Sequence, residues 1–321
     1  MSPVGNNCRI GVRGTGLMAT PTVLRRTTYL RPMSKSDPLL PYKGSIIKEM
    51  YLHTADENYV VARWAHDNRL YTDFFWNSVH ALEKYMKAML LFNGHPVKGH
   101  SHGLTGLYAE VVKVAGKLLP PLLTRPANLN IHHWVDLKPE EFLERLDGNG
   151  NADNRYLTYG YAQHAWYVHM VDTMVWSIRR LALPLDDPIV PRSQLATAPT
   201  HREVLERQPT YSNHLSLPLE QIIGGGDGDA RRALLNNNCA FAPDDFVHEP
   251  RASGTAGRNP VLLRRILHPL RSDHADGARH GYELASWLLS STKQSKPVRE
   301  EIQDAMRDAL AKHPGIDKPK P

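Results

Sequence analysis

The chain has 321 residues, of which 41% are hydrophobic, so it can bury a substantial core in one large domain or two. It contains no run of about 18 apolar residues, which excludes an ordinary membrane-spanning helix and predicts no membrane association. Two cysteines, Cys8 and Cys239, are too few for a disulfide framework or a zinc finger, and we expect a reducing, cytoplasmic compartment.

The net charge of +6 is concentrated at the amino terminus. Residues 1–50 carry eight lysines and arginines against two acidic residues, whereas residues 51–321 carry 31 of each sign. Affinity for nucleic acid of any sequence comes mainly from clustered basic residues, and this balanced body gives no compositional sign of such a patch. Segment 1–45 has little apolar periodicity. We expect a disordered basic tail, or a start codon placed too early, rather than a transit peptide.

Helical patterns begin at Thr54 and Glu57, which fit a T-x-x-E capping box. Apolar residues then recur at helical spacing over about 72–92 and again over 104–118. A fourth helix is predicted over about 155–183, where the same spacing ends at a proline. Because strand alternation is scarcely visible, these amphipathic helices predict an all-α fold, an antiparallel four-helix bundle.

Two further segments follow this bundle, which we place at residues 46–185. Residues 186–260 are rich in Pro, Gly, Asn and Asp, and we interpret them as an irregular insertion or linker. Their glycine run at 224–229 lacks the Lys-Ser/Thr ending of a phosphate-binding P-loop. Helical patterns return within 261–321, and we expect these C-terminal helices to pack on the bundle.

Residues 99–103 read GHSHG, which fits the G-x-S-x-G pattern of a serine-hydrolase nucleophile elbow. An elbow needs an apolar strand directly before the serine, and Pro96 and Lys98 occupy that position here. We therefore expect Ser101 to cap the helix that follows, not to act as a nucleophile. The neighbouring histidines lack a fourth ligand in a recognisable place, so no metal site is predicted.

Three stretches of the predicted helices together resemble a known family. They read ADENYVVAR at 55–63, ALEKYMKAML at 81–90 and HGLTGL at 102–107. In this order they are similar to the HEPN family, the higher eukaryote and prokaryote nucleotide-binding domains, over about residues 46–185. The residues around Arg155, at the start of the predicted fourth helix, are also similar to that family.

The resemblance implies one of two functional classes. Some members of the family are metal-independent ribonucleases, including toxins of toxin-antitoxin systems, and carry an R-x4-6-H motif on a late core helix. The arginine of such a motif can stabilise phosphate charge and the histidine can transfer a proton near neutral pH. Other members lack the motif and act as binding or assembly modules. The matching spacings in this chain, none of them on the predicted fourth helix, are Arg125 with His132, Arg207 with His214, and Arg307 with His313.

We therefore expect a non-catalytic HEPN-like module, without a cofactor, that binds a partner protein or a nucleotide-bearing ligand. The resemblance implies a nucleotidyltransferase or another protein as partner, RNA or a nucleotide as ligand, and a homodimer. The residues that we expect to contact the ligand are Lys84, Lys87, Arg155 and Tyr156. The alternative for these residues is a solvated helix face with a tyrosine at the edge of the core. The alternative function is a toxin-type ribonuclease that uses Arg125 and His132.

The two functions make opposite predictions for RNA. We expect purified protein to leave total RNA intact in the presence of EDTA, as judged by gel electrophoresis. The physical reason is that Pro126 and two asparagines make the segment between Arg125 and His132 a loop rather than a helix that presents both side chains. Metal-independent cleavage that is lost in His132→Ala would instead identify the ribonuclease.

Overall fold

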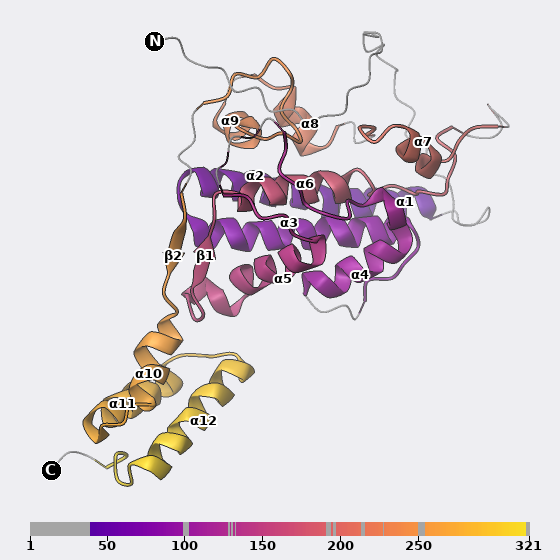
Figure 1. Cartoon of the computed structure of the whole chain (residues 1–321). Coiled ribbons are helices and arrows are strands. Elements are labelled where there is room, and N and C mark those ends of the chain that lie inside the picture. Colours follow the sequence, from indigo (N-terminus) through magenta and orange to yellow (C-terminus); the bar gives the residue numbers. More distant parts are fainter. Residues whose placement is uncertain are drawn as a thin grey trace, which may run out of the picture. The chain divides into compact units, whose positions relative to one another are not determined.

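The computed structural model describes residues 39–98, 103–127, 129, 131, 133–190, 194, 197–212, 216–226, 228–249 and 254–318. The chain divides into two units. The first contains the described residues of Met1–Asp147 and Ala165–Ser253, and the second contains those of Gly148–His164 and Gly254–Pro321. Both units consist mainly of helices, which confirms the all-α prediction (Figure 1). Within the described residues, no helix combines the length and apolar character needed to cross a bilayer.

The first unit is built around α3 (Tyr71–Phe92), a helix of 22 residues. The other elements of this unit, in chain order, are α1 (Leu40–Ile47), the π-helical turn η1 (Lys48–His53), α2 (Thr54–Asp67), α4 (Leu104–Ala115), the 3-10 turn η2 (Gly116–Leu118), α5 (Pro139–Gly150), whose last residues belong to the second unit, α6 (Tyr167–Arg179), α7 (His201–Arg207), α8 (Pro218–Ile223) and α9 (Asp229–Leu235).

Helix α3 is the centre of the hydrophobic core because apolar residues occupy most of its circumference. It packs against α2, α4 and α6, and Figure 1 shows it running between them. Phe75, Leu82 and Met86 have no exposed surface, and each buried side chain of this size contributes about 1.5–3 kcal/mol to folding. Phe75 also meets Tyr167 of α6 edge to face, with ring centroids 5.5 Å apart.

The predicted fourth helix, over about 155–183, is wrong in its first part. Helix α6 begins only at Tyr167, after the 3-10 turn η3 (Asp153–Tyr156) and the strand β1 (Tyr161–Gln163). Leu157 has a φ angle of 58°, in the left-handed region that a right-handed helix cannot contain. Since α6 has only 13 residues, the more specific prediction of an antiparallel four-helix bundle is not confirmed.

The start of the helical region also differs from the prediction. The capping box at Thr54 and Glu57 does not form, because α1 and η1 run directly into α2. The Thr54 hydroxyl donates to the Met50 carbonyl at 2.7 Å instead of capping a free helix end. Helix α1 begins inside the predicted tail, 1–45, while residues 1–38 lie outside the described residues.

Residues 186–260 are predicted as an irregular insertion or linker. Their described part has three short helices within the first unit, α7, α8 and α9. Helices α8 and α9 pack on α2. Leu219 of α8 and Leu234 of α9 are fully buried, so the segment contributes to the core although its composition resembles a linker. Helix α7 has the capping box that α2 lacks, formed by Thr200 and Glu203.

The second unit has its own hydrophobic core. Strand β1 pairs in antiparallel fashion with β2 (Ala256–Arg258), and at Gly160 any side chain would collide with the Arg258 carbonyl. The helical elements that follow are η4 (Leu263–Leu267), α10 (His268–Leu270), α11 (Ala275–Ser291) and α12 (Lys296–Lys312). Leu270, Ala285 and Ile302 are at the centre of the core that these helices enclose. That they also pack on the first unit stays a prediction.

The described core predicts the effect of a charge on α4. Leu107→Asp should lower the free energy of unfolding by more than about 3 kcal/mol, because Leu107 is fully buried and the carboxylate would have no partner. Urea titration followed by circular dichroism measures this loss. Ala109→Asp, on the exposed side of the same helix, is the control and should change stability by less than about 0.5 kcal/mol. Equal midpoints for the two variants would contradict the placement of α4.

Candidate functional site

An ion pair is buried between α2 and α6. Arg63 of α2 donates to a carboxylate oxygen of Asp172 in α6, and the two residues are 0% and 2% exposed. The Tyr59 hydroxyl, one helical turn before Arg63, donates to the other Asp172 oxygen at 2.6 Å. The Asn238 amide donates to the Tyr59 oxygen at 2.9 Å. We call these four residues the Arg63 network.

Burial and charge act in opposite directions within this network. Burial by itself lowers the pKa of the Arg63 guanidinium, but the facing Asp172 carboxylate and its hydrogen bond raise that pKa above its ordinary value. Burial, together with the Asp172 charge, raises the pKa of the Tyr59 hydroxyl well above its usual range. Arg63 therefore stays charged and Tyr59 neutral at physiological pH, and both act as hydrogen-bond donors.

A second network lies one turn earlier on α2. Arg179 at the end of α6 donates to both oxygens of Asp56, at 2.8 and 2.9 Å, and to both oxygens of Glu220 in α8, at 2.7 and 2.8 Å. The Tyr85 hydroxyl of α3 donates to Asp56 at 2.6 Å. We call these residues the Arg179 network. It connects α2, α3, α6 and α8. An arginine that binds a carboxylate with two parallel hydrogen bonds fixes the relative orientation of the two groups and also neutralises their charges.

The Arg63 network continues into α9. The Arg63 guanidinium donates through Nε to the Ala233 carbonyl at 2.9 Å, and through its third nitrogen to the Asn236 carbonyl at 2.5 Å. Carbonyl groups at the end of a helix lack hydrogen-bond donors within that helix, and here a buried arginine is the donor. The end of α9 is thus attached to the charged centre of the core.

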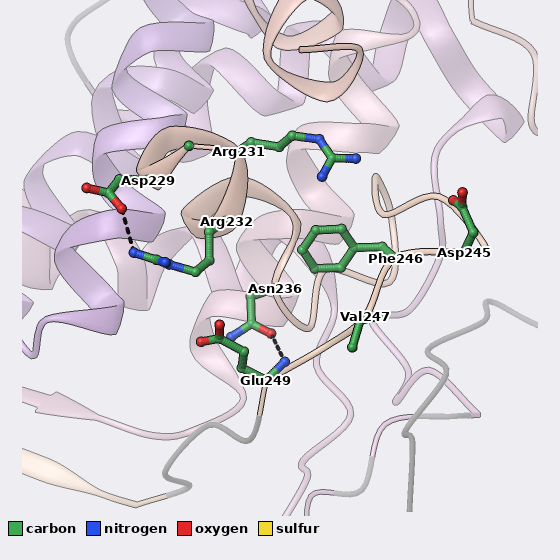
Figure 2. Close-up of a pocket in the computed structure, with 9 residues that line it drawn as sticks. Asp229, Arg231, Arg232, Asn236, Asp245, Phe246, Val247 and Glu249 are labelled. Atoms are coloured by element: carbon green, nitrogen blue, oxygen red, sulfur yellow. Dashed lines mark hydrogen bonds and ion pairs between the residues drawn. The ribbon is translucent and has the colours of Figure 1, made fainter. Parts of the chain in front are cut away.

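A pocket of about 570 Å³ lies along α9, from Gly228 before its first residue to Asn236 at this end. Figure 2 shows its wall, formed by α9 on one side and the segment 245–249 on the other. Its volume falls in the range of about 300–1,000 Å³ that is typical of small-molecule sites. The residues that line it are Gly228, Asp229, Arg231, Arg232, Asn236, Asp245, Phe246, Val247 and Glu249.

The pocket combines cationic, aromatic and acidic groups. The Arg231 guanidinium lies over the Phe246 ring, 5.3 Å from its centroid, and its Nε donates to the Ile223 carbonyl at 3.1 Å (Figure 2). Arg232 forms an exposed ion pair with Asp229 at 2.5 Å. The lining residues include no serine, cysteine or histidine. The carboxylates of Asp229, Asp245 and Glu249 outnumber the two arginines, so the pocket offers groups of both charges to a polar ligand.

The predicted contact residues on α3 have protein partners. Lys84 donates to the Asn58 side chain at 2.6 Å, and burial lowers the pKa of its ammonium group. Lys87 pairs with Glu83 on the same helix at 2.5 Å. This agrees with the alternative interpretation of a polar helix face, and neither lysine lines the pocket.

The other two predicted contacts belong to the second unit. Arg155 lies in η3 and donates through Nε to the Ala152 carbonyl at 3.2 Å. Tyr156 is 80% exposed, so it is not at the edge of a core. Ligand contact by these residues stays a prediction.

The ribonuclease alternative stays a prediction, because only Arg125 of its pair lies within the described residues. Arg125 lines a smaller pocket of about 440 Å³ with Trp134 and Asp136 and donates to the Ile131 carbonyl at 3.3 Å. His132 lies outside the described residues, as does Ser101.

The pocket residues were missed because they fall in the segment predicted as a linker. One signal was present, the adjacent pair Arg231-Arg232 just after the glycine run. Phe246 and Glu249 lie near α9 only after the chain has folded, and no local sequence pattern predicts that proximity.

Comparisons of the chain with protein-family models, with curated proteins and with solved structures gave no match. The resemblance of residues 46–185 to the HEPN family therefore stays an expectation.

The Arg63 network predicts a large effect of removing one charge. Asp172→Ala should lower the free energy of unfolding by about 3–5 kcal/mol, because it leaves a buried guanidinium without its counterion. Asp186→Ala removes the exposed partner of Arg202 and should cost less than about 1 kcal/mol. Urea unfolding of both variants checks the difference, and similar losses would show that the Arg63 ion pair is not essential to the fold.

Proposed function

We propose that the chain is a non-catalytic helical module that binds a nucleotide-bearing ligand in the pocket beside α9. The observation that carries the proposal is the placement of two arginines and an aromatic ring around one pocket of ligand size. The resemblance to a nucleotide-binding family supports the same ligand class independently of the pocket.

Each group in the pocket has a counterpart in a nucleotide. The guanidinium groups of Arg231 and Arg232 match phosphate oxygens, which arginine can bind with two parallel hydrogen bonds. Stacking of a base on Phe246 requires that the Arg231 guanidinium, which lies over the ring, turn toward the phosphate. The carboxylates of Asp245 and Glu249 accept hydrogen bonds and so match ribose hydroxyls or amino groups of a base.

Binding of a partner protein is the second candidate. An exposed apolar stripe on α1 and the residue before it favours it, because Leu39, Tyr42 and Ile46 recur at helical spacing and are 58%, 69% and 53% exposed. We propose a nucleotidyltransferase or another protein as the partner class from the family resemblance alone, and likewise a homodimer and a cytoplasmic location.

The proposed function predicts nucleotide affinity that depends on the pocket arginines. A fluorescent adenosine diphosphate analogue, titrated into the full chain, should bind, and Arg232→Gln should weaken binding by about 10-fold or more. A hydrogen bond to a charged group is worth about 1.5–3 kcal/mol, and 1.4 kcal/mol corresponds to a factor of ten. Arg207→Gln, at an exposed arginine of α7 outside the pocket, is the control and should bind like the wild type. Absence of binding by the wild type would refute the proposal.

A further inference from the structure

We infer that Arg63 is a positioning residue for the pocket: from inside the core it holds the end of α9, and through α9 the segment 245–249, in the arrangement that forms the wall. The inference rests on the proposed function for its meaning in ligand binding. The connection from a buried ion pair to a pocket wall does not depend on which ligand binds.

The first step of the connection joins the core to α9. Arg63 uses separate nitrogens for Asp172, Ala233 and Asn236, so one planar guanidinium ties α2, α6 and the end of α9 together. Because the group is rigid and fully buried, its orientation is set by Asp172 and by Tyr59, which hydrogen-bonds the same carboxylate. The carbonyls that it holds are therefore fixed relative to the core.

The second step joins α9 to the opposite wall. The Asn236 side-chain oxygen accepts from the Glu249 backbone N–H at 2.9 Å, an interaction drawn in Figure 2. The neighbouring Asn237 donates its backbone N–H to the His248 ring at 3.0 Å and its side-chain amide to the Glu249 carbonyl at 3.0 Å. Three hydrogen bonds thus attach residues 248–249 to the two asparagines that follow α9.

The backbone between these two steps is in an uncommon conformation. Asn237 has a φ angle of 55°, in the left-handed region that asparagine tolerates better than most residues. Such a conformation persists where surrounding contacts hold it, and here the contacts are the Asn236 carbonyl bound to Arg63 on one side and the bonds to residues 248–249 on the other. Loss of Arg63 removes the anchor on the core side.

The Arg179 network provides an internal comparison. It has the same composition, a buried arginine, an aspartate of the core and a tyrosine 2.6 Å from that aspartate. Its fourth partner is Glu220 of α8, and none of its members lines the pocket. A substitution in this network therefore disturbs the core and leaves the bonds from Arg63 to the end of α9 in place, whereas α8, which this network holds, supports Arg231 through the Ile223 carbonyl.

The test compares Arg63→Lys with Arg179→Lys in the full chain. Two quantities are measured, affinity for the fluorescent adenosine diphosphate analogue and hydrogen exchange of the Asn237 and Glu249 amides. We expect Arg63→Lys to weaken binding at least 10-fold and to speed exchange at both amides at least 10-fold. Arg179→Lys should leave exchange at both amides within about twofold of the wild type, because the Arg63 bonds to the end of α9 remain.

A milder pair keeps the test decisive if either lysine variant does not fold. Tyr59→Phe and Tyr85→Phe each remove one hydroxyl from the aspartate of one network. Only Tyr59→Phe should speed exchange at Asn237 and Glu249. Equal exchange within either pair would overturn the inference. If the wild type does not bind the analogue, the proposed function fails, while the exchange measurements still decide whether Arg63 positions the wall.

Discussion

Two arginines buried in a helical core impose the main constraint on this structure. A guanidinium without exposed surface must find a carboxylate and further hydrogen-bond acceptors, since an unpaired buried charge costs several kcal/mol. Arg63 meets this requirement with Asp172 and the carbonyls of α9, and Arg179 meets it with Asp56 and Glu220. These polar contacts fix the positions of α2, α6, α8 and α9 relative to one another. Apolar packing alone would tolerate several arrangements.

The same constraint explains why a segment of linker-like composition belongs to the core. Residues 186–260 supply Glu220, Asn238 and the end of α9, all of which are partners of the two networks. Charged partners are directional and hydrophobic contacts are not, so these partners fix the position of a segment whose buried leucines also join the core. The pocket is a product of this arrangement, since one of its walls is the end of α9.

The proposed function and the family resemblance have different foundations. The resemblance concerns helices of the first unit, residues 46–185, whereas the pocket lies between α9 and residues 245–249. The proposal of a nucleotide-bearing ligand therefore draws on two separate observations, the order of three sequence stretches and the groups that line the pocket. The predicted contacts Lys84 and Lys87 are hydrogen-bonded to neighbouring polar groups on α2 and α3, and ligand contact by them stays a prediction.

The sequence by itself determined the all-α class and the position of α3 and α4, because their apolar residues repeat at helical spacing and that signal is local. It did not reveal the break before α6, where Leu157 turns left-handed and β1 pairs with a strand far along the chain. Only the tertiary structure decided which polar residues meet. Arg63 and Asn236 are separated by most of the first unit, and their contact depends on the burial of charge after the helices have packed, which no local pattern encodes.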